Sequence, residues 1–114
     1  NKEGLIVYQD LKERAYEIDH MGRIFHYNKI DAQNDHFYGF GEKTGYLDKK
    51  NQRLRMATKD AIGQDPEFGD PMYKHIPFYI KSNSLSKYSL GIFYDNIGIG
   101  IHTFQLTGEI LTTF

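Results

Sequence analysis

The order of apolar and polar positions along the chain predicts short β-strands separated by turns. Tyr and Phe recur beside β-branched residues in short runs, which is the composition of strands. Turn-forming residues, such as those at 19–22, interrupt these runs. In the first half, the predicted strands cover residues 4–8, 14–19, 23–30 and 36–41. We expect this half to be a meander, in which each strand pairs with the next.

The second half predicts a β-hairpin and one or two further strands. The runs at 75–82 and 88–95 are joined by a polar loop of Ser and Asn residues, so a hairpin is the simplest arrangement. Two more apolar runs follow Gly98 and Gly108. No segment shows a sustained helical period, and the chain therefore predicts an all-β fold.

Between the two halves, a polar stretch from about residue 42 to residue 74 predicts one long loop. Its window 48–56 is the one place for a turn of helix, but it has too few apolar positions to form a buried stripe. Pro66 and Pro71 punctuate the remainder of the stretch. Loops of this length usually carry function. We expect an antiparallel β-sandwich, or a large twisted sheet, with a functional loop.

Length and composition narrow the classes of function. At 114 residues the chain has the size of one domain, and we expect residues 1–114 to form a single one. Its 14 basic and 15 acidic side chains give no electrostatic reason to expect a nucleic acid or a membrane as partner. The absence of cysteine excludes disulfides, thiolate zinc sites and cysteine nucleophiles. It also suits the cytoplasmic location that we expect.

The N-terminus carries no sign of targeting. It lacks a basic leader and an apolar signal core, and no apolar run in the chain reaches the roughly 18 residues of a membrane span. The chain does not begin with Met. We expect it to be an excised piece of a longer polypeptide.

Three glycines around a Lys-Thr pair, Gly39, Gly41 and Gly45, raise the question of a phosphate site. A P-loop needs Gly immediately before the Lys, and no Gly precedes Lys43. A dinucleotide fingerprint needs a third Gly where Thr44 stands, followed by a helix. We expect no nucleotide and no other cofactor. The glycines instead predict a strand that bulges and leaves its sheet.

Metal and nucleophile chemistry have little support. No two of the five histidines have the spacing of paired metal ligands, and His26, inside a strand pattern, predicts a half-buried side chain with a hydrogen-bond partner. Asp65, Glu67 and Asp70 lack the spacing of a calcium loop and predict a solvated acidic turn. There is no Gly-x-Ser-x-Gly motif. Paired carboxylates for glycoside chemistry cannot be placed from their sequence spacing.

Five short pieces occur in a specific order. They are Gly39-Phe40-Gly41-Glu42, Asp60 after a short polar strand, Asp70-Pro71-Met72-Tyr73, Pro77-Phe78-Tyr79-Ile80 and Gly91-Ile92-Phe93-Tyr94-Asp95-Asn96. With these pieces, roughly residues 4–96 resemble the N-terminal β-sandwich domain of family 31 glycoside hydrolases, the α-glucosidase and α-xylosidase group. Residues 97–114 do not follow the family's pattern.

The resemblance implies a galactose-mutarotase-like β-sandwich, here a truncated portion, that packs against a catalytic (β/α)₈ barrel later in the same polypeptide. In the family, the catalytic aspartates belong to the barrel, one of them in a W-x-D-M-N-E type segment. This chain has no such segment, so it contains no catalytic residue and is expected to be inactive alone. The parent protein is expected to be a retaining α-glucosidase acting on an α-glucoside or related oligosaccharide.

The resemblance also implies one substrate-binding residue, Asp60, on a loop that reaches over the barrel mouth. The family often has Asn at the positions of Ala57 or Thr58. The plainer alternative is that Asp60 only starts a turn before Gly63. A truncated sandwich would expose strand edges and the apolar face meant for the barrel, which predicts homo-oligomers.

Two other functions stay open. One is a stand-alone carbohydrate-binding β-sandwich that uses Tyr and Phe faces as sugar platforms. The other is a structural interaction domain with no ligand.

Overall fold

The computed structural model describes residues 4–65, 67, 69, 70 and 72–95, and also the strands at 100–104 and 109–113. The strands in chain order are β1 (Tyr16–Ile18), β2 (Ile24–Lys29), β3 (Asp35–Gly41), β4 (Arg53–Met56), β5 (His75–Asn83), β6 (Ser89–Phe93), β7 (Gly100–Phe104) and β8 (Glu109–Thr113). All pairings among them are antiparallel. In these residues we find no helix that could cross a membrane.

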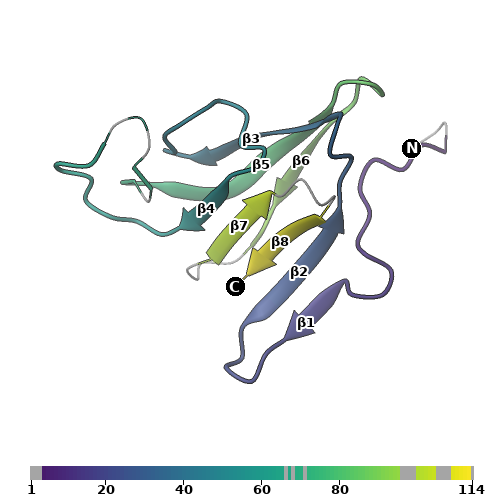
Figure 1. The fold of residues 1–114 in the computed structure, drawn as a ribbon, viewed down its shortest axis with the longest axis horizontal. Helices are drawn as coiled ribbons and strands as arrows, with labels where there is room; N and C mark the ends of the chain where they lie inside the picture. Colours follow the sequence, from purple (N-terminus) through teal and green to yellow (C-terminus); the bar gives the residue numbers. More distant parts are fainter. Residues whose placement is uncertain are drawn as a thin grey trace.

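The strands form two sheets, which are seen as two layers in Figure 1. The larger sheet has the order β1-β2-β8-β7-β4, and the smaller sheet has the order β3-β5-β6. The predicted all-β antiparallel β-sandwich is therefore confirmed. The two strands predicted after Gly98 and Gly108 are β7 and β8, and they lie in the middle of the larger sheet.

The core lies between the sheets and follows from the alternation of side chains along each strand, except at Phe40, where the register shift in β3 interrupts the alternation. Phe37, Phe40 and Tyr79 of the smaller sheet are fully buried, and the rings of Phe40 and Tyr79 stack with centroids 5.0 Å apart. Leu54 and Met56 of β4 join the same cluster from the larger sheet. Burying each such side chain stabilises the fold by about 1.5–3 kcal/mol. Through Leu54 and Met56, this core anchors β4, and the two connecting loops extend from the ends of that strand.

The predicted meander of the first half is confirmed only for one pair of strands, because β1 pairs with β2. β2 pairs with β8, and β3 pairs with β5, so the chain changes sheets between β2 and β3. The side chain of Asp31 stabilises this crossing, because its Oδ1 accepts hydrogen bonds from the backbone N–H groups of Gln33 and Asn34. The prediction was wrong beyond β2 because pairing of consecutive strands is only a tendency, and here the chain passes to the other sheet after Lys29.

The strand predicted at residues 4–8 is also wrong. This segment is irregular, and the chain first meets β2 at the isolated bridge between Asp10 and Asn28. It is tied to residues beside the smaller sheet, since the hydroxyl of Tyr88 donates to the carbonyl of Val7 at 3.0 Å and the side chain of Tyr8 hydrogen-bonds with Tyr94. The predicted hairpin is confirmed: β5 and β6 pair with Phe78 opposite Phe93.

The prediction of one uninterrupted loop from 42 to 74 is wrong because β4 lies within it. In β4 the two Arg side chains are exposed and Leu54 and Met56 are buried, so the strand has the period of two expected of a half-buried strand. Two buried apolar residues are enough to anchor a strand against an existing core, although they are too few to show in the sequence. Two shorter loops remain, one on each side of β4.

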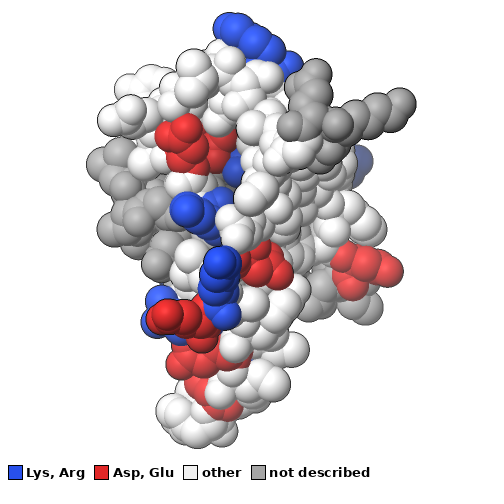
Figure 2. Space-filling view, turned by 90° about the vertical axis from the view of Figure 1, so that its right-hand side faces the viewer, with Lys and Arg blue, Asp and Glu red and all other residues white. Residues whose placement is uncertain are grey.

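Acidic and basic residues are interspersed on the described surface that Figure 2 shows. Neither sign forms a continuous field there, in keeping with the formal net charge of -1. This face therefore has no electrostatic footprint for a polyanion.

Candidate functional site

The glycine-rich end of β3 is a β-bulge. The register with β5 shifts between Gly39 and Gly41, and the buried Phe40 between them has a φ of 72°. A Cβ on Gly39 would lie 2.8 Å from the carbonyl oxygen of Phe78, and one on Gly41 would lie 2.9 Å from the backbone nitrogen of Ile76. The predicted bulge is confirmed, and glycine is needed there because β5 approaches so closely.

The Lys-Thr pair after the bulge holds the loops together. Nζ of Lys43 donates to the carbonyl of Arg55 and to Oδ1 of Asp70, which lies 2.5 Å away. The hydroxyl of Thr44 donates to the carbonyl of Gly69 at 2.5 Å. Both side chains are thereby used in linking the loop before β4 to the loop after it.

Asp70 closes the outer edge of β4. Its Oδ2 accepts a hydrogen bond from the backbone N–H of Arg55 at 2.8 Å, while Oδ1 pairs with Lys43. The prediction of a solvated acidic turn is thus wrong for Asp70, whose side chain is mostly covered. The prediction of a solvated turn does fit Asp65, whose Oδ1 accepts a hydrogen bond from the backbone N–H of Glu67 in an exposed turn. Among the described residues, no group of three possible metal ligands comes together.

The loop between β3 and β4 is built around a buried lysine. Nζ of Lys49 donates to the carbonyls of Thr44 and Tyr46, at 2.8 and 2.6 Å. Burial lowers the pKa of Lys49, and the nearby charge of Lys43 lowers it further. These bonds replace water around the ammonium group, and they fix the loop in one shape.

A groove of about 570 Å³ runs along this loop and β4. Tyr46, one of its lining residues, is 74% exposed, and the lining includes the hydroxyl residue Thr44 and the amide residues Asn51 and Gln52. The lining residues are Thr44, Gly45, Tyr46, Lys50, Asn51, Gln52, Arg53, Leu54 and Asp70. An exposed aromatic ring beside hydrogen-bonding groups can stack on a sugar and bind its hydroxyls.

The same loop covers the outer edge of β3. Asp48 accepts a hydrogen bond from the backbone N–H of Phe37, and its other oxygen lies 2.7 Å from Nδ1 of His36. Burial raises the pKa of Asp48, but the hydrogen bonds from Phe37, His36 and Lys50 outweigh it and hold that pKa below its ordinary value. The edges of β3 and β4 are therefore both closed by side chains of the connecting loops.

Asp60 lies on the exposed loop after β4, outside the groove that Tyr46 borders. Its Oδ1 accepts a hydrogen bond from the backbone N–H of Ile62 at 3.2 Å, and the turn continues to Gly63 with a φ of 76°. Oδ2 of Asp60 makes no hydrogen bond within the described part of the chain. Asp60 does start a turn, as the plainer alternative expected, but its other carboxylate oxygen keeps the predicted sugar contact open.

The loop that carries Asp60 is tied at its base. The N–H of Lys59 donates to the carbonyl of Met72 at 3.0 Å, and the hydroxyl of Thr58 lies 3.2 Å from Nδ1 of His75. Ala57 is buried, so it offers no polar group beside Asp60. Thr58 is exposed and is the neighbouring hydroxyl.

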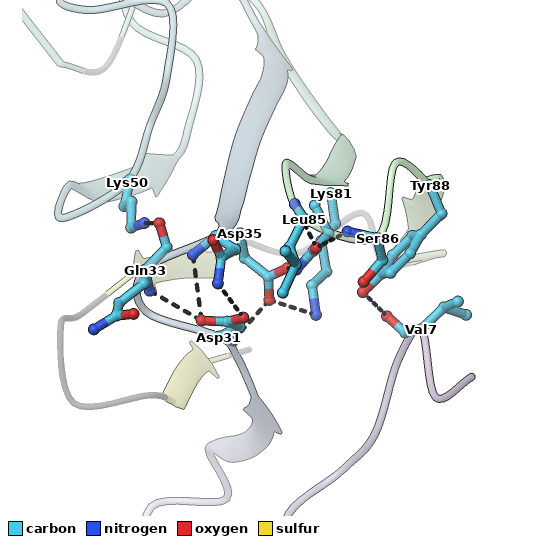
Figure 3. Close-up of polar contacts among 11 residues, drawn as sticks. Val7, Asp31, Gln33, Asp35, Lys50, Lys81, Leu85, Ser86 and Tyr88 are labelled. Atoms are coloured by element: carbon cyan, nitrogen blue, oxygen red, sulfur yellow. Dashed lines mark hydrogen bonds and ion pairs between the residues drawn. The ribbon is translucent and has the colours of Figure 1, made fainter. Parts of the chain in front are cut away.

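A buried ion pair, absent from the sequence predictions, lies at the opposite end of β5 (Figure 3). Nζ of Lys81 is 2.8 Å from Oδ2 of Asp35, and the amide of Asn83 donates to the other carboxylate oxygen. Burial and the nearby carboxylates of Asp35 and Asp31 raise the pKa of Tyr88. The alternation of side chains along β5 is enough to predict that Lys81 points into the core. No local sequence pattern predicts that Asp35 is its partner.

His26 is a structural residue. Nε2 lies 2.9 Å from Asp10, Nδ1 lies 3.1 Å from the hydroxyl of Tyr94, and the ring of Tyr16 stacks on the imidazole at 4.3 Å. The predicted hydrogen-bond partner is confirmed, and the ring is more deeply buried than expected.

Comparison with known proteins decides the family. Residues 1–99 match the family described as the glycosyl hydrolase 31 N-terminal galactose mutarotase-like domain. The chain belongs to this domain family. The resemblance seen in the five sequence pieces is therefore confirmed.

Two relatives illustrate the match of this family 31 domain. The chain is 35% identical over 92 residues to alpha-glucosidase 2 of Bacillus thermoamyloliquefaciens, which covers 81% of the chain and 11% of the glucosidase. A mutant family 31 dextranase of Flavobacterium johnsoniae in complex with isomaltotriose superposes with a TM-score of 0.84 and 26% identity. The same dextranase in complex with glucose gives 0.83.

The two dextranase structures match 99% of this chain and 13% of their own. The match therefore extends to strands β7 and β8, which the sequence resemblance did not reach. The chain spans only about an eighth or less of each relative.

Proposed function

We propose that this chain is the non-catalytic N-terminal domain of an α-glucosidase-like glycoside hydrolase. In that protein it scaffolds the catalytic barrel and supplies the Asp60 loop to the substrate. The observation that carries the proposal is the 35% identity to an alpha-glucosidase over 92 residues. The hydrolysis itself, with retention at the anomeric carbon of an α-glucoside, belongs to aspartates outside residues 1–114.

Asp60 has the chemistry for the sugar contact. Its carboxylate is exposed, one oxygen anchors a turn, and the other is open to solvent. A carboxylate accepts strong hydrogen bonds from hydroxyl groups, and two vicinal hydroxyls can orient a sugar ring against it. The loop is held at its base by Met72 and His75, so it loses less conformational entropy on binding a sugar than an untied loop would.

The experiment is the kinetics of Asp60 variants in the full-length enzyme. We expect Asp60→Ala to lower kcat/KM for α-glucosides by roughly tenfold, about 1.4 kcal/mol of transition-state binding, because a charged hydrogen-bond acceptor is lost. Asp60→Asn keeps the turn acceptor but loses the charge, and it is expected to fall between Asp60→Ala and wild type.

Glu67→Ala is the control, since Glu67 is an exposed carboxylate on the same loop. It should leave kcat/KM unchanged. If Asp60→Ala has the same kinetics as the wild type, Asp60 does not contact the sugar. If the wild-type enzyme hydrolyses no α-glucoside, the proposed function is wrong.

A second candidate function is a stand-alone carbohydrate-binding β-sandwich. The groove beside Tyr46 favours it, because an exposed aromatic ring lies next to amides of Asn51 and Gln52. This function predicts sugar binding by the chain itself, without any barrel.

A further inference from the structure

The loop that carries Asp60 is fixed at its start by the core. Met56 and Ala57 are 2 and 7% exposed, so the end of β4 is held between the sheets. Thr58, Lys59 and Asp60 follow as exposed residues. The carboxylate of Asp60 therefore lies only a few residues beyond a buried side chain, and its position depends on what holds the residues between them.

Two interactions hold these residues, and both lead to the start of β5. The backbone N–H of Lys59 donates to the carbonyl of Met72 at 3.0 Å. The hydroxyl of Thr58 lies 3.2 Å from Nδ1 of His75, the first residue of β5. Within the described part of the chain, neither of these two side chains has another hydrogen-bond partner. The side chain of Thr58 is therefore directed to His75 alone.

The backbone of His75 is held in place by the bulge at the end of β3. His75 pairs with Gly41 in the register of β3 and β5. A Cβ on Gly41 would lie 2.9 Å from the backbone nitrogen of Ile76 and 3.1 Å from the carbonyl oxygen of Lys74. The N–H of Glu42 also donates to that carbonyl at 3.0 Å. The backbone on both sides of His75 is therefore packed against β3, and bulges commonly aim a neighbouring side chain.

We propose that His75 is a positioning residue, which fixes the carboxylate of Asp60 through the hydroxyl of Thr58. This inference rests on the proposed function and adds the residues that set where the sugar contact is made. A displacement of about 1 Å in a group that orients a substrate can lower the rate by about 100-fold. Because the turn at Asp60 is exposed, packing does not fix it, and the hydrogen bond at its base does.

The kinetics of variants of the full-length enzyme on an α-glucoside test the inference. Thr58→Val keeps the shape of the side chain but removes its hydroxyl, and His75→Phe keeps a ring but removes Nδ1. We expect each variant to lower kcat/KM by about threefold, because each breaks the same hydrogen bond. The double variant should lose no more than either single one. Thr58→Ser and His75→Asn return a hydroxyl and an amide to these positions, and they should recover most of the loss.

The same two variants in an Asp60→Ala background distinguish positioning from a merely structural role. If His75 acts through Asp60, then Thr58→Val and His75→Phe leave kcat/KM of the Asp60→Ala enzyme unchanged, since the carboxylate that they position is absent. A structural role would lower kcat/KM by the same factor in both backgrounds, and that result overturns the inference. Wild-type kinetics for both variants in the Asp60 enzyme also overturn it.

His20→Phe is the matched control, because His20 is exposed in the turn between β1 and β2, at the opposite edge of the larger sheet from β4. It should leave kcat/KM unchanged. Asp60→Ala by itself tests the proposed function separately. If Asp60→Ala lowers kcat/KM while Thr58→Val and His75→Phe do not, only the positioning role of His75 is wrong. If Asp60→Ala behaves as the wild type, the sugar contact is wrong and His75 has nothing to position.

Discussion

At the scale of single residues, Gly39 shows that the close approach of a neighbouring strand's backbone can require glycine. Its φ of 126° lies where side chains are strained, and a Cβ would meet the carbonyl oxygen of Phe78 at 2.8 Å. Gly63 also has a positive φ, but its Cβ position is open. A substitution at Gly39 therefore meets both a steric clash and backbone strain, whereas a substitution at Gly63 meets backbone strain alone.

Gly39→Ala is expected to lower the free energy of unfolding by about 3 kcal/mol, because strain and a clash with backbone add. Gly63→Ala should cost only about 1 kcal/mol, from strain alone. Urea unfolding of the chain followed by circular dichroism measures both. Equal costs for the two variants would contradict the assigned clash.

At the scale of elements, the long connecting loops protect strand edges. Asp70 and Lys43 occupy the edge of β4, and Asp48 and Lys49 occupy the edge of β3. An unprotected edge is a template for pairing with another chain. The interaction of Lys43 with Asp70 therefore serves both stability and solubility.

Asp70→Ala is expected to destabilise the chain by about 3 kcal/mol, because it leaves the buried ammonium of Lys43 without its carboxylate partner. It also frees the N–H of Arg55 at the strand edge, so light scattering on heating should begin at a lower temperature. Glu67→Ala, on the same loop, should change neither quantity. If Asp70→Ala unfolds at the same urea concentration as Glu67→Ala, the ion pair contributes nothing to stability.

At the scale of the whole molecule, the two candidate functions differ in what residues 1–114 can do alone. As a scaffold for a barrel, the chain is expected to show no saturable chemical-shift change when titrated with maltose or isomaltose to millimolar concentration. As a stand-alone binding module, it would show saturable shifts around Tyr46 and Gln52. NMR titration of the isotopically labelled chain decides, and a Tyr46→Ala variant identifies the groove if shifts occur. Cytoplasmic location and homo-oligomers stay predictions.

The sequence by itself determined the features that depend on local geometry. Alternating side chains predicted most strands, the Ser/Asn loop predicted the β5–β6 hairpin, and the glycines predicted the bulge at the end of β3. Each rests on the pleat of a strand or on the allowed φ of one residue, so neighbouring residues suffice. The ordered sequence pieces also identified the family.

Only the tertiary structure decided which strands share a sheet and which charges meet. β2 pairs with β8 rather than β3, Asp70 reaches Lys43 across 27 residues, and Asp35 meets Lys81 inside the fold. Such contacts depend on how the core brings distant segments together, and no local period encodes them. For the same reason, the sequence selected Asp60 by resemblance, while the structure showed that its carboxylate holds a turn with one oxygen open to solvent.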